Sequence, residues 1–230
     1  MKKLILIGVA VSAMVLGANV ASAADPSLPP SWSGFYGGLE LGYASTGGQI
    51  YDYNNNYAPT AWTDATAGGS FLLGGKMGYD FDTGSNFVVG LSADVKGLLG
   101  SDANCSSAGG CDNGAKGQPH LSYGIKGLAA LDARAGFLFT PENLLYVEGG
   151  LALGDVVTHH RDNSEYDGSS HVMTGWNIGV GIEHKVSQNM SLVLDGKYYN
   201  LGEIDVTSVG ETYGYKPTAF VASVGFNVRF

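Results

Sequence analysis

The stretch that most constrains the fold is 218–230, TAFVASVGFNVRF, in which apolar residues occupy every second position. The apolar set is Phe220, Ala222, Val224, Phe226, Val228 and Phe230. Apart from Val221, the residues between them are small or polar, and they include Asn227 and Arg229. Side chains on a strand point alternately to opposite faces, so this pattern predicts a strand with one apolar and one polar face.

Seven further stretches show the same alternation. They lie at 32–44, 69–81, from 87 onward, 121–139, 144–156, around 176–183 and around 192–198. Short turns (82–86, 140–143 and 187–189) alternate strictly with long polar inserts (45–66, 99–120, 158–170 and 203–216). A soluble sandwich also alternates, but short turns facing long loops are typical of an outer-membrane barrel. Closure of such a barrel satisfies every backbone group in lipid. The sequence therefore predicts an all-β, eight-stranded antiparallel up-and-down transmembrane β-barrel over residues 32–230.

The amino terminus carries export signals. Lys2 and Lys3 precede an apolar run at 4–16, and Ala21-Ser22-Ala23 supplies a small-residue cleavage site. We expect residues 1–23 to be a cleaved signal peptide, because the apolar run is too short to span a membrane. Residues 24–31 then form a Pro-rich periplasmic lead. The expected location is the bacterial outer membrane, and Phe230 at the end of the last strand is the expected signal for the barrel-assembly machinery.

Charge and cysteine content narrow the partners. Without Lys2 and Lys3 the chain has 10 basic and 21 acidic residues, a formal charge of −11. Nucleic acid is an unsuitable partner, because phosphate binding needs a basic surface. Cys105 and Cys111 lie close together in an exported chain, which favours a local disulfide. A metal site would require more Cys or His nearby than His120 alone.

Charged residues fall on the faces opposite the apolar ones and so are expected inside the barrel. The inward acids are Glu40, Asp94, Asp132, Glu148, Glu183 and Asp195, and the inward bases are Lys76, Lys96, Lys126, Arg134, Lys185, Lys197 and Arg229. An eight-stranded interior is just wide enough for side chains to fill, and unpaired buried charges are costly. These residues therefore predict a salt-bridged plug, with ion conduction or catalysis as the alternative.

Other residues carry weaker hypotheses. His159, His160 and His171 are candidate haem ligands in a polar surface insert, and we otherwise expect no cofactor and no metal site. Ser169 and Ser170 lie beside His171, but no G-x-S-x-G motif is present and we expect no enzymatic activity. The inserts carry many acids, which suit a solvated outer face or divalent bridging to lipopolysaccharide.

Several stretches resemble the Omp25/Omp31/RopB family of alphaproteobacterial outer-membrane proteins, which are described as porin-like. They are WSGFYGGLELGYA, LDARAGFLF, LLYVEGGLALG, GWNIGVGIEHKVSQNMSLVLDGKYYNLGEIDV and the terminal VGFNVRF. The resemblance implies a surface-exposed antigen that supports envelope integrity, with haemin binding in some relatives. It also implies covalent tethering to peptidoglycan through a mature Ala-Asp amino terminus, here Ala24 and Asp25. We expect a structural surface protein, with a small-solute porin or haem-binding receptor as the alternative and a lipid-modifying hydrolase as a weaker one.

Overall fold

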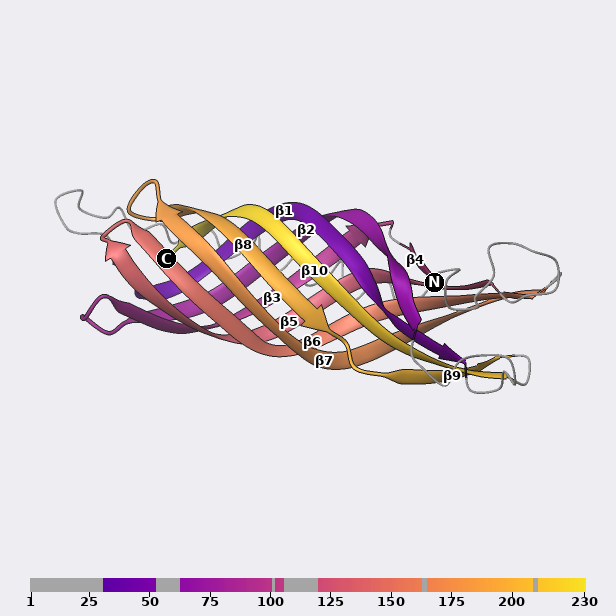
Figure 1. Ribbon diagram of the computed structural model, residues 1–230. Helices are drawn as coiled ribbons and strands as arrows, with labels where there is room; N and C mark the ends of the chain where they lie inside the picture. Colours follow the sequence, from indigo (N-terminus) through magenta and orange to yellow (C-terminus); the bar gives the residue numbers. More distant parts are fainter. Residues whose placement is uncertain (1–30, 53–62, 101, 106–119, 163–164, 209–210) are drawn as a thin grey trace.

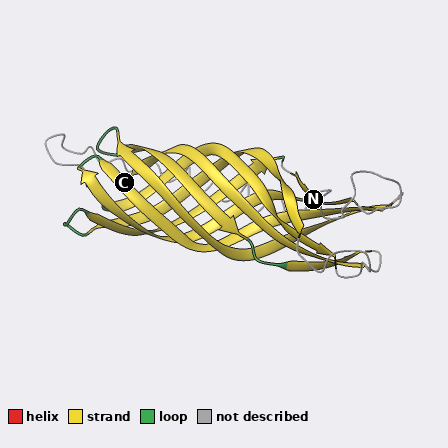
Figure 2. Cartoon of the chain, viewed as in Figure 1, coloured by secondary structure: helices red, strands yellow, loops and turns green. Residues whose placement is uncertain are grey.

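The computed structural model describes residues 31–52, 63–100, 102–105, 120–162, 165–208 and 211–230 (Figure 1). All of the regular structure in these ranges is β-strand (Figure 2). The strands are β1 (Gly34–Asp52), β2 (Thr63–Asp82), β3 (Phe87–Leu99), β4 (Asp102–Cys105), β5 (His120–Thr140), β6 (Asn143–Asp162), β7 (Glu165–Lys185), β8 (Met190–Asn200), β9 (Ile204–Ser208) and β10 (Glu211–Arg229). Within the described ranges, no helix is long and apolar enough to cross a membrane.

The sheet closes on itself through its first and last strands. β1 pairs antiparallel with β2 on one edge and with β10 on the other, and the ring continues through β8, β7, β6, β5 and β3. The predicted eight-stranded antiparallel barrel is therefore confirmed. The closing strand has the predicted faces, because Phe220, Val224 and Phe226 are exposed outside while Ser223, Asn227 and Arg229 are buried inside.

The two short strands extend two of the eight positions in the ring. β4 pairs with β2 and β5, which are also the partners of β3, and β9 follows β8 along β10. Gly100 (φ +81°) lies between β3 and β4, and Gly202 (φ +77°) lies between β8 and β9. This left-handed backbone conformation favours glycine, which allows each strand to bend and continue.

The three predicted short turns are confirmed. They join β2 to β3, β5 to β6 and β7 to β8, all at the same end of the barrel (Figure 1). The long inserts contain more strand than predicted: in the described residues, strand covers most of 158–170 and 203–216 and parts of 45–66 and 99–120. β6 and β7 run to Asp162 and from Glu165 and pair along their whole length, so insert 158–170 is a hairpin. Strand pairing needs no apolar face in water, and the alternation of apolar residues therefore marks only part of each strand.

Among the described strands, two facing edges are unpaired at the long-hairpin end of the barrel, one on β7 and one on β9. β7 pairs with β8 only as far as Trp176 and Asn200, and β9 pairs with β10 rather than with β7. Among the described strands, the β7 segment 165–175 is consequently paired on its β6 side alone. The hairpins β6–β7 and β9–β10 diverge in this region (Figure 1).

The barrel is apolar outside and layered inside. Large outward side chains are exposed on every one of the eight positions, for example Leu41, Leu91 and Ile178. Inside, a small apolar cluster around Trp32 and Leu144 lies at the short-turn end. A larger one, which includes Tyr123, Ile125 and Leu201, lies toward the long hairpins. The charged residues occupy the lumen between these two apolar layers.

Candidate functional site

All eleven residues of the predicted lumen network lie buried inside the barrel. They are Glu40, Lys76, Asp94, Lys96, Asp132, Arg134, Glu148, Glu183, Asp195, Lys197 and Arg229. Inward alternation places them there, and their strands surround the whole lumen. The structure adds Asp80, which the sequence analysis did not include, and also buries Lys185.

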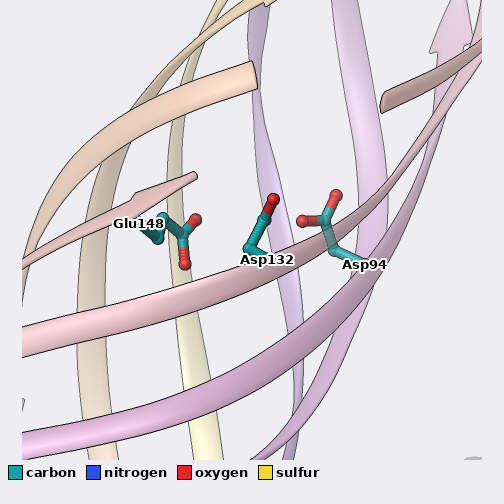
Figure 3. A group of neighbouring side chains, drawn as sticks. All are labelled: Asp94, Asp132 and Glu148. Carbon is teal, nitrogen blue, oxygen red and sulfur yellow. The ribbon is translucent and has the colours of Figure 1, made fainter. Parts of the chain in front are cut away.

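Lys197 of β8 is the centre of the network. Its Nζ lies 2.8 Å from Asp94 Oδ2, 2.7 Å from Asp132 Oδ2 and 2.6 Å from Glu148 Oε1. The three carboxylates come from β3, β5 and β6 and converge on one point inside the barrel (Figure 3). One ammonium group, fully buried, therefore connects β8 to three strands that are not its neighbours in the ring, including β3 on the opposite side.

Two more lysines extend this cluster around the lumen. Lys76 Nζ lies 3.0 Å from Glu148 Oε1 and 3.6 Å from Asp195 Oδ2. Lys96 pairs with Asp94 and lies 2.9 Å from Glu40 Oε1. Neutral donors add hydrogen bonds to these carboxylates, which lowers the cost of burying their charge. These donors are the Asn177 amide to Asp132 (2.7 Å), the Tyr146 hydroxyl to Asp195 (2.7 Å) and the Ser223 hydroxyl to Glu40 (2.9 Å).

A second cluster, built on arginine, lies nearer the short-turn end. Arg134 donates to Asp80 Oδ2 (3.2 Å) and to Glu183 Oε2 (2.6 Å), and its guanidinium lies 3.8 Å from the ring centroid of Tyr146. Arg229 of the closing strand donates to the same Asp80 oxygen at 2.8 Å. Asp80 thus connects β2 to both arginines. It lies in the predicted stretch 69–81 on the same face as Lys76, but it was not among the predicted inward acids.

Trp32 closes the short-turn end of the lumen. The indole is fully buried, and its Nε1 donates to the Pro141 carbonyl at 3.0 Å. Arg229 Nη1 donates to the Trp32 carbonyl at 2.5 Å, and the Lys185 ammonium lies 4.7 Å from the ring centroid and also contacts the Ser31 carbonyl. Residues 31–33, just before β1, are therefore fixed inside the mouth of the barrel. The sequence pattern did not predict these contacts.

Inward glycines make room for the long charged side chains. A Cβ at Gly74 would lie 2.9 Å from Glu40 Oε1 and 3.0 Å from Lys96 Cγ. A Cβ at Gly150 would lie 2.0 Å from the Leu131 carbonyl oxygen and 3.0 Å from Asp132 Oδ1. The abundance of glycine in these strands is thus partly a packing requirement of a narrow, charged lumen.

One predicted inward base is in the wrong place. Lys126 is exposed rather than buried, because the β5–β6 register shifts between Ile125 and Gly127. A bulge of this kind reverses the alternation locally, which a period-two pattern cannot show. With Lys126 removed and Asp80 added, the buried set in the described part of the chain holds seven carboxylates and six cationic groups.

The arrangement favours closure over ion coordination. Asp94, Asp132 and Glu148 offer oxygens within 4.8 Å of one another, a geometry that suits a hard cation. Lys197 Nζ lies within 2.8 Å of all three residues and fills that position. The salt bridges span the lumen, so the charged groups bind one another rather than line an open channel.

The remaining predicted residues are placed only in part. The β6–β7 register sets His159 opposite Gly168, His160 opposite Asp167 and His171 opposite Val156, and haem binding by these histidines stays a prediction. Ser170 Oγ donates to Asp155 Oδ1 at 2.7 Å, which is not the Ser–His pair that hydrolysis needs.

The cysteine pair and the predicted sites at the two chain termini lie only partly within the described residues. Cys105 ends β4, but Cys111 lies outside the described residues, so the disulfide stays a prediction. The signal peptide and Ala24-Asp25 also lie outside them. Phe230 is exposed, and its amide donates to the Phe35 carbonyl at 2.9 Å, while its recognition by the assembly machinery stays a prediction.

Comparison with known proteins agrees with this architecture. Residues 9–230 match the family described as the outer membrane protein β-barrel domain. The chain belongs to this family. It is 27% identical to the 31 kDa outer-membrane immunogenic protein of Brucella melitensis biotype 1, over the full length of both chains. It is 30% identical to a 22 kDa outer membrane protein of Rhizobium leguminosarum bv. viciae, over 87% of this chain and 79% of the relative. The resemblance to the Omp31-type proteins is thereby confirmed, and the protein is located in the outer membrane.

Solved structures of other outer-membrane proteins share the fold at low sequence identity. Outer membrane protein AlkL is 16% identical with a TM-score of 0.52, and covers 91% of this chain and 95% of its own. OprG from Pseudomonas aeruginosa is 12% identical with a TM-score of 0.50, and covers 86% of this chain and 97% of its own. The outer membrane protease OmpT from Escherichia coli also reaches 0.50, at 10% identity. These likenesses extend to the barrel alone.

Proposed function

We propose that this outer-membrane barrel is a non-conducting, non-enzymatic structural protein that supports the integrity of the cell envelope. The observation that carries the proposal is the contact of Lys197 with three carboxylates from strands that do not neighbour β8, one of them Asp94 on the opposite side of the lumen. Ion pairs spanning a barrel of this width leave no continuous water path, and they cross-link strands that are far apart in sequence. The 31 kDa relative is named an immunogenic outer-membrane protein, which fits a barrel with long hairpins outside the cell.

We further propose that the amino-terminal lead tethers the barrel to peptidoglycan through a mature Ala24-Asp25 end. Supporting this, Trp32 is locked into the short-turn end of the lumen by Pro141 and Arg229. A pull on the lead would therefore be transmitted to the buried core rather than to the edge of β1. The Pro-rich composition of residues 26–30 suits an extended spacer between the barrel and the cell wall.

Mass spectrometry of muropeptides tests the tether. Sacculi are purified from cells producing the full chain, digested with a muramidase and a protease, and searched for a peptide that begins at Ala24. The peptide is expected for the wild type and for Ser27→Ala, and it should be lost in Asp25→Lys. A wild-type digest without any muropeptide-linked peptide from Ala24 would refute the tether while leaving the closed barrel untouched.

Complementation tests the structural role. A strain lacking the protein is expected to become sensitive to bile salts and EDTA, and the wild-type chain should restore resistance. The double variant Lys197→Met and Trp32→Ala weakens both the charged lumen network and the apolar cluster at the short-turn end. At equal abundance in the membrane, it should restore resistance poorly. Full restoration by that variant would contradict the role proposed for the lumen.

A further inference from the structure

A polar groove lies on the outer wall of the barrel, at the end with the long hairpins. It has a volume of about 440 Å³, and its lining includes Gln49, Asp64, Tyr198, Asn200, Lys216 and Thr218. Strand register brings these residues together, because Gln49 pairs with both Asp64 and Lys216, and Thr218 pairs with Asn200. The groove thus crosses four neighbouring strands, β2, β1, β10 and β8. Its volume falls in the range of about 300–1,000 Å³ that small-ligand sites occupy.

Two adjacent glycines of β1 lie at the groove: Gly48 lines it, and Gly47 pairs with Thr218, another lining residue. A Cβ at Gly47, which occupies an outward position, would meet no atom within 4 Å. Gly48 has φ +145°, and the β1–β2 register shifts between Thr46 and Gly48. The wall is therefore stepped at this point and lacks the side chain that would fill the step. The absence of a neighbour around Gly47 also means that a larger residue can be introduced there without a clash.

The groove begins where the apolar band of the barrel ends. Tyr198 contacts Trp176 with ring centroids 5.8 Å apart, and Phe220 is exposed beside it on β10. Aromatic residues at the rim of the apolar band mark the boundary between hydrocarbon and headgroups. Beyond this rim the outward residues become polar, as Asn200, Thr218 and Lys216 show. The groove accordingly faces the headgroup layer of the outer leaflet.

The chemistry of the lining suits a sugar better than a bare phosphate. Amide, hydroxyl, ammonium and carboxylate groups are all present, so donors and acceptors are mixed. The Asp64 carboxylate accepts from Gln49 Nε2 at 3.1 Å, and Lys216 lies 3.3 Å from Glu203, so the cation is already compensated. In the described part of the chain, the Tyr198 and Thr218 hydroxyls have no hydrogen-bond partner and are available to a ligand.

We propose that this groove binds the sugar headgroup of lipopolysaccharide in the outer leaflet. The groove lies at the level of the outer-leaflet headgroups, so its ligand should be a lipid of that leaflet. Its charged side chains are of both signs and two hydroxyls are free, which favours a headgroup with many hydroxyl groups over that of a phospholipid. The site goes beyond the structural role proposed above and does not depend on the state of the lumen. Bound lipid would seal the stepped wall at the membrane boundary.

Native mass spectrometry of the refolded mature chain in detergent, titrated with purified lipid A, tests the site. The decisive variant is Gly47→Leu, which adds a large outward side chain next to the lining residue Thr218, its strand partner. Its matched control is Gly37→Leu on the same strand, an outward position where a Cβ would meet only the Lys76 carbonyl oxygen at 4.0 Å. We expect the wild type and Gly37→Leu to bind equally, and Gly47→Leu to bind roughly tenfold more weakly, as loss of about two hydrogen bonds would give.

A second variant removes the free hydroxyls without changing shape. Tyr198→Phe combined with Thr218→Val should also weaken lipid A binding, while a heat-modifiability gel confirms folding of every variant. Phosphatidylglycerol should bind the wild type and Gly47→Leu alike. The proposal is overturned if lipid A binds Gly47→Leu as tightly as it binds the wild type, or if phosphatidylglycerol displaces lipid A at equal concentration.

Discussion

At the residue scale, Lys197 concentrates the electrostatics of the lumen in one side chain. Its ammonium compensates three carboxylates that come within 4.8 Å of one another, and all of them are buried. Removing one partner of a buried ion pair destabilises a fold by far more than the intact pair stabilises it, because the remaining charge stays buried without a counter-charge. A surface pair such as Lys216–Glu203 contributes little for the opposite reason.

We therefore predict that Lys197→Met lowers the free energy of unfolding by about 3–5 kcal/mol. Lys216→Met, the matched control, should lower it by about 0–1 kcal/mol. Urea titration in detergent, followed by the band shift of the folded barrel on gels, measures both. Equal losses for the two variants would show that the lumen network contributes no more than a surface pair.

We also predict that replacing Lys197 with a smaller residue lets the same three carboxylates bind a cation. Lys197→Ala leaves space among Asp94, Asp132 and Glu148, whose oxygens suit a hard divalent cation. Millimolar Ca²⁺ should raise the unfolding midpoint of Lys197→Ala and leave that of the wild type unchanged. If Ca²⁺ shifts both midpoints equally, it acts elsewhere on the protein.

Trp32 gives a third prediction at this scale. Trp32→Ala removes a fully buried indole, its hydrogen bond to Pro141 and its contacts with Lys185 and Arg229, so we expect a loss of about 3–5 kcal/mol in stability. Trp176→Ala, on the half-exposed lipid face, is the control and should cost less. A thermal melt followed by near-UV circular dichroism separates the two. Similar melting points would mean that Trp32 is not an anchor.

Residues also show where sequence reasoning reaches its limit. Alternation placed Lys197, Arg134 and Glu148 inside the barrel because each lies in a regular strand. It failed at Lys126, where a bulge shifts the register. Asp80 lies on the same face as Lys76 within a regular strand, but it was not among the predicted inward acids. Which cation meets which carboxylate depends on strand register around the whole ring, and a single sequence does not contain that information.

At the element scale, β7 differs from every other long strand in losing one neighbour partway along. Residues 176–185 pair with both β6 and β8, whereas 165–175 pair only with β6. In an antiparallel strand, alternate residues direct their backbone groups to opposite edges. Half of the amides in 165–175 therefore point to an edge where the described residues supply no strand partner.

We predict an alternating pattern of hydrogen exchange along β7. Amides of 165–175 that face away from β6 should exchange much faster than their neighbours, and the pattern should vanish in 176–185, where both edges are paired. Amide-resolved NMR in micelles measures this directly. Uniform protection across 165–175 would contradict the open edge.

Turn chemistry and loop length predicted the elements well. Asp82 to Asn86 forms a tight turn in which Gly84 N donates to Asp82 Oδ1, and Gly84 and Asn86 adopt positive φ, as those residue types favour. The extracellular hairpins were less predictable. Their strands continue beyond the regular alternation of apolar residues, so the signal that defines a spanning strand is missing there.

At the scale of the whole molecule, the closed ring and the filled lumen have one physical origin. Lipid outside demands apolar side chains and a fully paired backbone, and the narrow interior must then accommodate every other residue. The chain meets this demand with seven carboxylates, six cations and the glycines that make room for them. The fold and the inward strand faces could be predicted from the sequence. Whether the ion pairs close the lumen could be judged only from the positions of the side chains.

Single-channel conductance of the refolded mature protein in planar bilayers tests the central claim that this lumen is closed. Heat modifiability on gels serves as the folding control. We predict that the folded wild type gives no conductance steps, and that Lys197→Ala combined with Arg134→Ala gives small cation-selective steps by unblocking the carboxylates. Steps from the folded wild-type barrel that change when Lys197 or Arg134 is neutralised would contradict closure and make the protein a porin.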